Sequence, residues 1–229
     1  MTNDFWIDIL KLILLDIVLS GDNAVVIALA CRNLPAEQQK KAVFWGSFAA
    51  IALRVVLTFV AVWLLKLPFV EVIGGLLLVY IAVKLINGEE EPETLKSSSK
   101  MGEAVRTIIL ADFIMSLDNV LAIAAVSHGD LRLIVIGLAI SIPLIIWGSQ
   151  LLLRLMNRFP VIILLGAGLL GYTAGEMVLS DKIIGHFIES NFPHAHYVIP
   201  IGLAVLVIAY GKFAGKKKTE EHAATVEEV

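Results

Sequence analysis

The sequence predicts an all-helical, polytopic membrane protein with seven transmembrane helices: a 3+3 inverted-topology repeat plus one C-terminal helix. Three observations lead to this fold class. The chain of 229 residues is 58% hydrophobic and only 17% charged, whereas soluble domains are about a quarter charged. Its mean hydropathy is +0.85, and its apolar residues gather in segments of the length that a bilayer requires, about 20 residues each. The third observation is an internal repeat.

Charged residues, prolines and glycines separate the apolar segments. The first breaks are Arg32 to Lys41, Lys66 to Pro68 and a Glu-, Ser- and Lys-rich stretch from Gly88 to Met101. No basic residue precedes the first apolar run, so we expect a retained span there and not a cleaved signal peptide. The expected spans are residues 5–31, 42–65, 69–87, 104–127, 131–153, 160–180 and 197–214.

The basic residues predict how these spans are oriented. Thirteen lysines and arginines fall on one side of the expected membrane, and only Lys66, Arg132 and Lys182 fall on the other. Since Lys and Arg are enriched in cytoplasmic loops, we expect a multi-pass protein of the cell membrane with its N-terminus outside and its C-terminus in the cytoplasm. The expected parts are a first three-helix repeat (1–87), a cytoplasmic linker (88–103), a second, inverted repeat (104–180), an external loop with the seventh helix (181–214) and a cytoplasmic tail (215–229).

The repeat is clearest in the first and fourth expected spans. Residues 16–30 read DIVLSGDNAVVIALA and residues 112–126 read DFIMSLDNVLAIAAV, with six of fifteen positions identical. An odd number of spans per repeat places the two copies in opposite orientations. Inverted repeats whose polar, interrupted helices meet near the midplane are typical of transporters. The non-apolar positions, in the pattern D-x-x-x-S-x-D-N, are Asp16, Ser20, Asp22 and Asn23 and their counterparts Asp112, Ser116, Asp118 and Asn119.

Four aspartates inside spans are expensive, at about 2.5–3.5 kcal/mol each on insertion scales. Such groups must be neutral, paired, hydrated or bound to a cation. Few basic residues lie deep within the expected spans; Lys11 and Arg54 do, and two cations cannot neutralise four carboxylates. A shared pocket of these aspartates would therefore attract a metal ion, protons or both. The Ser20-Gly21 pair could also unwind a turn and free backbone carbonyls as ligands.

The donor atoms in this pattern are all oxygens, with no cysteine or histidine among them. Oxygen ligands suit Mg²⁺, Ca²⁺ and Mn²⁺ and argue against copper or structural zinc. The one cysteine, Cys31, excludes a disulfide within the chain and any zinc site built on cysteines. The residue types alone do not choose among the three hard cations.

The doubled D-x-x-x-S-x-D-N within these spans resembles the TerC family of integral membrane proteins, over roughly residues 5–214. That family is named for tellurium resistance, and several bacterial members are linked to manganese efflux. The resemblance implies Mn²⁺ as the transported ion, with Ca²⁺ or Mg²⁺ as alternatives and no tightly bound cofactor. It implies a metal site made by Asp16, Asp22, Asn23, Asp112, Asp118 and Asn119. Protons are the hypothetical coupling ion.

Four further residues are candidates for supporting roles. Ser20 and Ser116 belong to the repeated pattern, and Glu176 is a candidate secondary ion or proton site. Arg54 has two open interpretations, a counter-ion to an aspartate or a residue that reaches the lipid headgroups. The glycines at 171 and 175 indicate close helix packing.

Other classes of function have weaker support. An oxyanion carrier for tellurite is opposed by the acidic side chains, and an intramembrane aspartyl protease lacks the G-x-G-D context, so we expect no enzyme. A non-transporting membrane partner of a stress or secretion complex stays open. Nothing indicates a nucleic-acid partner; the expected partners are a divalent cation, protons and the lipid bilayer, and the oligomeric state is not predicted.

Overall fold

The protein is built from α-helices. The computed structural model describes residues 2–64, 67, 69–87, 97–127, 130–192 and 194–227, and no strand occurs in these ranges. The described helices are α1 (Thr2–Leu19), α2 (Gly21–Cys31), α3 (Ala36–Leu64), α4 (Val70–Asn87), α5 (Ser97–Ser127), α6 (Leu131–Arg158), α7 (Val161–Ser180), α8 (Ile184–Asn191) and α9 (Ala195–Glu227).

The helices are those of a multi-pass membrane protein. Within the described residues, five helices (α3, α4, α6, α7 and α9) are long and apolar enough to cross a membrane, and the bent pair α1–α2 makes a sixth if it counts as one span. The remaining expected span, 104–127, lies inside the 31-residue helix α5. The all-helical class is confirmed, and the seventh crossing stays a prediction.

The first expected span, 5–31, is broken in its middle. Helix α1 ends at Leu19 and α2 starts at Gly21, and the two axes differ by 48°. Ser20 at the junction has φ −106° and ψ 6°, outside the helical region. Glycine is about 1 kcal/mol poorer than alanine in a helix, and serine, aspartate and asparagine compete for backbone hydrogen bonds. The local sequence S-G-D-N therefore explains the interruption.

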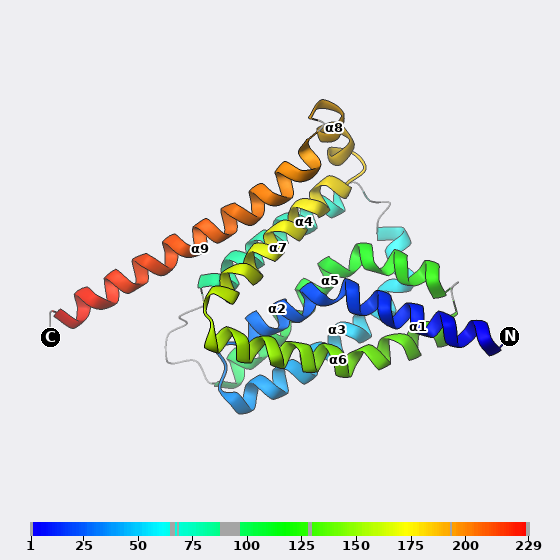
Figure 1. Ribbon diagram of the computed structural model, residues 1–229, viewed down its shortest axis with the longest axis horizontal. Helices are drawn as coiled ribbons and strands as arrows, with labels where there is room; N and C mark the ends of the chain where they lie inside the picture. The colour runs from blue at the N-terminus through cyan, green and yellow to red at the C-terminus, as the bar shows by residue number, and fades with distance from the viewer. Residues whose placement is uncertain are drawn as a thin grey trace.

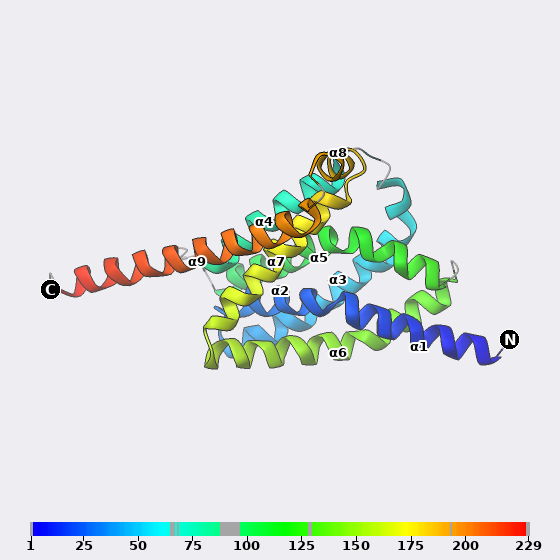
Figure 2. The ribbon, with the colours of Figure 1, turned by 45° about the horizontal axis from the view of Figure 1, so that its top comes forward.

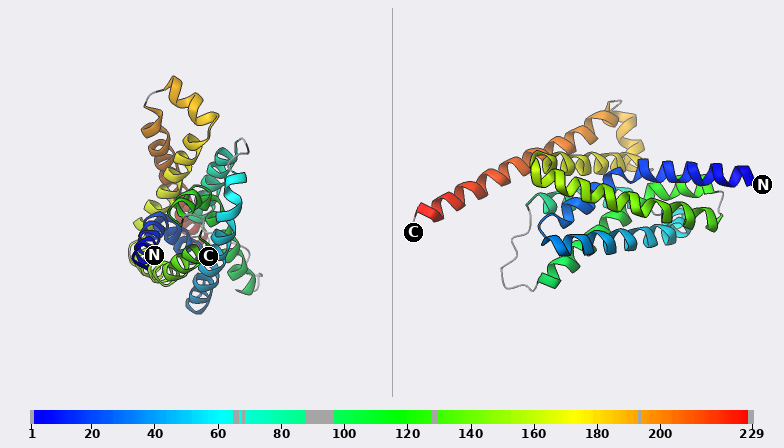
Figure 3. Two further views of the ribbon diagram at one scale, coloured as in Figure 1. Left: turned by 90° about the vertical axis from the view of Figure 1, so that its right-hand side faces the viewer. Right: turned by 60° about the horizontal axis from the view of Figure 1, so that its bottom comes forward.

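The helices form two groups that pack side by side (Figures 1 and 2). Helices α4, α7 and α9 pack against one another, and α1, α2, α3, α5 and α6 make a second bundle. The two ends of the chain lie at opposite ends of the molecule (Figure 1 and the right panel of Figure 3). The short helix α8 lies beside the start of α9, within the segment 181–214 expected to hold the external loop and the seventh helix.

Glycines bring the helices of the first group into close contact. A Cβ on Gly175 would lie 2.5 Å from the Pro200 Cα of α9, and one on Gly75 would lie 2.7 Å from the Ala174 carbonyl oxygen. Neither backbone contact leaves room for a side chain. The close packing expected from the glycines of α7 is therefore confirmed, and it follows the small-residue rule of membrane helices.

Many large apolar side chains lie on the outside of the molecule, while a few charged groups are buried within it. Large residues such as Leu76, Trp147 and Val205 are more than half exposed, whereas Arg54 is 1% exposed. This distribution suits a lipid environment, where an interior charge must find its partners inside the protein.

Two expected boundaries fall near the limits of the described residues. Of the expected linker 88–103, residues 88–96 lie outside the described ranges, and α5 begins at Ser97. Helix α9 continues through the expected tail as far as Glu227.

Candidate cation site

Arg54 lies at the centre of a buried polar cluster between the two halves of the chain. Its Nη1 donates to Asp16 Oδ1 of α1 at 2.5 Å, and its Nη2 donates to Asp112 Oδ1 of α5 at 2.6 Å. Asp16 is 0% exposed and Asp112 is 4% exposed. Of the two interpretations of Arg54, the structure therefore supports the counter-ion, and it shows one guanidinium shared by two aspartates.

The serines of the repeated pattern complete the shell around Arg54. Ser20 Oγ accepts from Nη1 at 2.8 Å, and Ser116 Oγ accepts from Nε at 3.1 Å. Each serine also donates to the aspartate four residues before it, at 3.3 Å for Asp16 and 3.2 Å for Asp112. Residues four apart lie on one face of a helix, so the D-x-x-x-S spacing in each copy presents a carboxylate and a hydroxyl to the same guanidinium.

The charges of this cluster do not cancel. One guanidinium faces two carboxylates, so the three groups carry a formal charge of −1 when all are ionised. Buried ion pairs persist only where the geometry and the remaining hydrogen bonds are good. The cluster favours a cation over an anion, because an anion would add to the excess negative charge.

Asn23 is buried beside this cluster and is 3% exposed. Among the described residues, neither its Oδ1 nor its Nδ2 has a hydrogen-bond partner. A cavity of about 10 Å³ separates it from Asp112 and is lined by both residues and by apolar side chains of α2, α3 and α5. That volume is about one water molecule. Asp16 Oδ2 also has no partner in the part of the chain that the structure describes, so the buried cluster contains oxygen acceptors that its own hydrogen bonds do not use.

The next residues of the pattern lie at the broken helix. Asp22 accepts a hydrogen bond from the Asn23 backbone N–H at 2.9 Å and interacts electrostatically with Arg54 and Asp112. Asn119 of α5 donates from Nδ2 to the Leu19 carbonyl oxygen at 3.2 Å. That carbonyl belongs to the last residue of α1, so the second repeat contacts the point where the first is interrupted.

The expected ligands do not form one preassembled metal cluster among the described side chains. No group of three or more carboxylate, imidazole or thiol side chains lies close enough to hold a metal ion within those residues. Asp16 and Asp112 are brought together by Arg54, with Asn23 beside Asp112, while Asn119 is engaged at the break. The Asp118 side chain lies outside the described residues, and the six-residue ligand set stays a prediction.

Glu176, the expected secondary site, is exposed on α7 and interacts with Tyr172. An ion pair that the sequence did not suggest joins Lys84 of α4 to Glu103 of α5, with Nζ and Oε1 2.6 Å apart. The only signal for it is the opposite charge of one residue before the linker and one at its end, which is too common a feature to predict a contact.

Comparisons with known proteins agree with the resemblance in the repeated pattern. A family model described as "Integral membrane protein TerC family" matches residues 1–219. The membrane protein YjbE of Bacillus subtilis is 43% identical, over 92% of this chain and 94% of its own length. YceF of the same organism is 28% identical over 95% of this chain and 87% of its own. The inner membrane protein YoaE of Escherichia coli K12 is 23% identical over 93% of this chain, which spans 44% of YoaE. No solved structure gives a significant match.

Proposed function

Because the chain belongs to the TerC family of integral membrane proteins, we propose that it exports a divalent cation, with Mn²⁺ as the first candidate, by alternating access around the Arg54 cluster. One observation carries the proposal. Carboxylates from both sequence repeats, Asp16 and Asp112, converge on a single positive charge in the interior. The guanidinium is itself a cation, and the acidic groups around it show that this interior position can balance a positive charge.

Helix packing supports the inverted repeat on which alternating access depends. The repeat pairs α1–α2 with α5, α3 with α6 and α4 with α7. Helix α3 packs against α5. Their counterparts in the other repeat, α6 and the pair α1–α2, also pack against each other. Helix α4 packs against its own counterpart, α7. In such folds one repeat rocks against the other around a fixed site. The opposite positions of the two termini (Figure 1) fit an outside N-terminus and a cytoplasmic C-terminus.

The cation would bind by loosening Arg54 from at least one aspartate. Asp16, Asp22 and Asp112, taken as ionised, carry three negative charges, and Arg54 carries one positive charge. The net charge of −2 matches the charge of one divalent cation. Asp16 Oδ2 and Asn23 Oδ1 are buried oxygens that no described side chain or backbone group pairs with. Carboxylate, amide and hydroxyl oxygens suit Mn²⁺, Mg²⁺ and Ca²⁺, and the excess negative charge opposes a tellurite-type oxyanion.

Outward transport of such an ion requires a source of energy. Moving one charge against 100 mV costs about 2.3 kcal/mol, so a divalent cation leaving a negative interior costs about 4.6 kcal/mol. Protons entering through the same aspartates would supply this energy, because carboxylates that release a metal can take up protons. Proton entry into proteoliposomes during Mn²⁺ movement is the measurement that tests the coupling separately from transport.

Manganese content of cells tests the function itself. Cells that express the wild-type protein in high Mn²⁺ should contain less manganese and grow better than cells that express Asp112→Asn or Asp22→Asn. Glu37→Gln is the control, since Glu37 is exposed at the start of α3. Equal manganese in all four strains, with equal protein in the membrane, would refute export and leave the non-transporting partner as the better explanation.

A further inference from the structure

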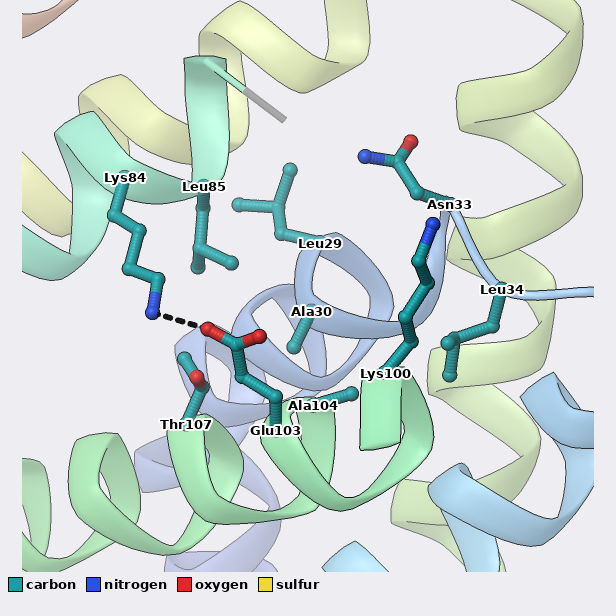
Figure 4. Close-up of a pocket in the computed structure, with 10 residues that line it drawn as sticks. All are labelled: Leu29, Ala30, Asn33, Leu34, Lys84, Leu85, Lys100, Glu103, Ala104 and Thr107. Carbon is teal, nitrogen blue, oxygen red and sulfur yellow. Dashed lines mark hydrogen bonds and ion pairs between the residues drawn. The ribbon is translucent and has the colours of Figure 1, made fainter. Parts of the chain in front are cut away.

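A second polar region lies outside the Arg54 cluster, at the end of the molecule where α2 finishes and α5 begins. One cavity of about 90 Å³ is lined by residues of α2, α4 and α5, including Lys84, Lys100 and Glu103. In Figure 4 Lys84 and Lys100 stand on either side of Glu103, and the dashed line marks the Lys84–Glu103 ion pair. This is the end that carries most of the basic residues.

A larger cavity continues from the first along α4 and α5. Its volume is about 570 Å³, and it shares Lys84, Glu103 and Thr107 with the smaller one. Arg106 adds another positive charge to its lining. The charged side chains of the two cavities are therefore three basic residues against one acid. Such a lining attracts an anion and repels a divalent cation, so the region does not belong to the proposed cation path.

Polar and apolar residues are arranged in the same order on both helices. On α4, Lys84 lies one turn closer to the end of the bundle than Tyr80, which is 62% exposed. On α5, which runs in the opposite direction, Arg106 lies one turn closer to that end than Leu110, which is 41% exposed. Residues four apart share a helix face. The larger cavity therefore has a basic end and an exposed apolar end on the same face.

We propose that the two cavities, called here the α4–α5 cavity, bind the phosphate of an anionic phospholipid, with the acyl chains along Tyr80 and Leu110. The lysine ammonium has three donors, so Lys84 can hold Glu103 and a phosphate oxygen together. Arginine suits phosphate through its forked donors. A free phosphate would use the basic end alone, whereas the exposed apolar surface beside it fits a lipid. Basic pockets between membrane helices on the cytoplasmic side bind anionic headgroups in this way.

The test is a titration of the purified full-length protein in detergent with three probes: phosphatidylglycerol, phosphatidylcholine and inorganic phosphate. Binding is followed by native mass spectrometry and by the melting temperature. Phosphatidylglycerol should bind and raise the melting temperature more than the other two. Arg106→Gln and Lys100→Gln should each weaken phosphatidylglycerol binding about five-fold, as expected for one basic residue near an anionic lipid.

Two variants separate this site from general surface charge. Lys40→Gln removes an exposed basic residue of α3 at the same end but outside both cavities, and it should bind the lipid like the wild type. Arg106→Lys keeps the charge and should retain most of the binding. Equal effects of phosphatidylcholine, full reproduction of the effect by inorganic phosphate, or an equal loss in Lys40→Gln would each overturn the proposal. None of these results depends on whether the protein moves Mn²⁺.

Discussion

At the residue scale, the buried charges of Arg54, Asp16 and Asp112 balance one another in part, and each needs the others to stay buried. Arg54 is 1% exposed and reaches Asp16, Asp112 and both serines of the repeated pattern. Removing one partner from a buried ion pair leaves an uncompensated charge, which costs about 3–5 kcal/mol. The same contacts put Arg54 in competition with any cation that uses these aspartates.

Substituting Arg54 should therefore have two opposite effects. Arg54→Gln should lower the melting temperature in metal-free buffer, because Asp16 and Asp112 lose their common partner. Added Mn²⁺ should stabilise this variant more than the wild type, since a ligand that binds only the folded state raises its stability. Melting curves with and without Mn²⁺ measure both effects, with the exposed Arg132→Gln as the control. An unchanged melting temperature would show that the buried contacts contribute nothing.

Asn23 offers a way to separate folding from transport. Both polar atoms of its side chain are buried and have no partner within the described ranges, and a buried polar group without a partner costs about 1–3 kcal/mol. Asn23→Leu should therefore melt at the same temperature or higher, yet it should reduce manganese export because it removes an oxygen beside Asp112. Melting curves and cellular manganese content test the pair of results. A variant that exports normally would exclude Asn23 from the cation path.

At the element scale, the break between α1 and α2 is the feature that distinguishes the two repeats. The first copy has Gly21 at the junction, whereas the second has Leu117 inside the unbroken helix α5. The break leaves the Leu19 carbonyl to accept its hydrogen bond from Asn119. Discontinuous helices are where transporters place ion sites and hinges, so the bend of 48° is the element most suited to move.

Gly21→Ala tests whether that bend matters for transport. A Cβ at this position meets nothing within 4 Å, and alanine favours a continuous helix by about 1 kcal/mol. The variant should be as stable as the wild type or more stable, and it should export manganese more slowly. Gly202→Ala of α9 is the matched control, since its Cβ also meets nothing within 4 Å. Normal export by Gly21→Ala would remove the break from the mechanism.

At the scale of the whole molecule, the sequence was most informative about features that follow from the length of its apolar segments and from its internal repeat. The apolar segments predicted the all-helical membrane class, and the S-G-D-N run predicted the interruption near Ser20. The seventh crossing, within α5, goes beyond the five or six spans found among the described residues. Segment length and hydropathy do not say how such a helix is inserted.

The sequence predicted which residues belong to the candidate site, but it did not predict the contacts between them. The repeated pattern identified Asp16 and Asp112, whose burial is confirmed. Arg54 lies 38 residues from Asp16 and 58 from Asp112, so only the packing of α3 against α5 and the first span reveals that one guanidinium serves both. Sequence spacing relates residues within one helix and does not determine which side chains meet between helices.

The most direct test of a cation path through the Arg54 cluster is Mn²⁺ flux in proteoliposomes with a defined membrane potential and proton gradient. Wild-type protein should move Mn²⁺ faster than protein-free vesicles, and Asp112→Asn, inserted to the same level, should reduce that flux to the background. Flux that is equal in the wild type and in Asp112→Asn, or absent from both, would contradict the account.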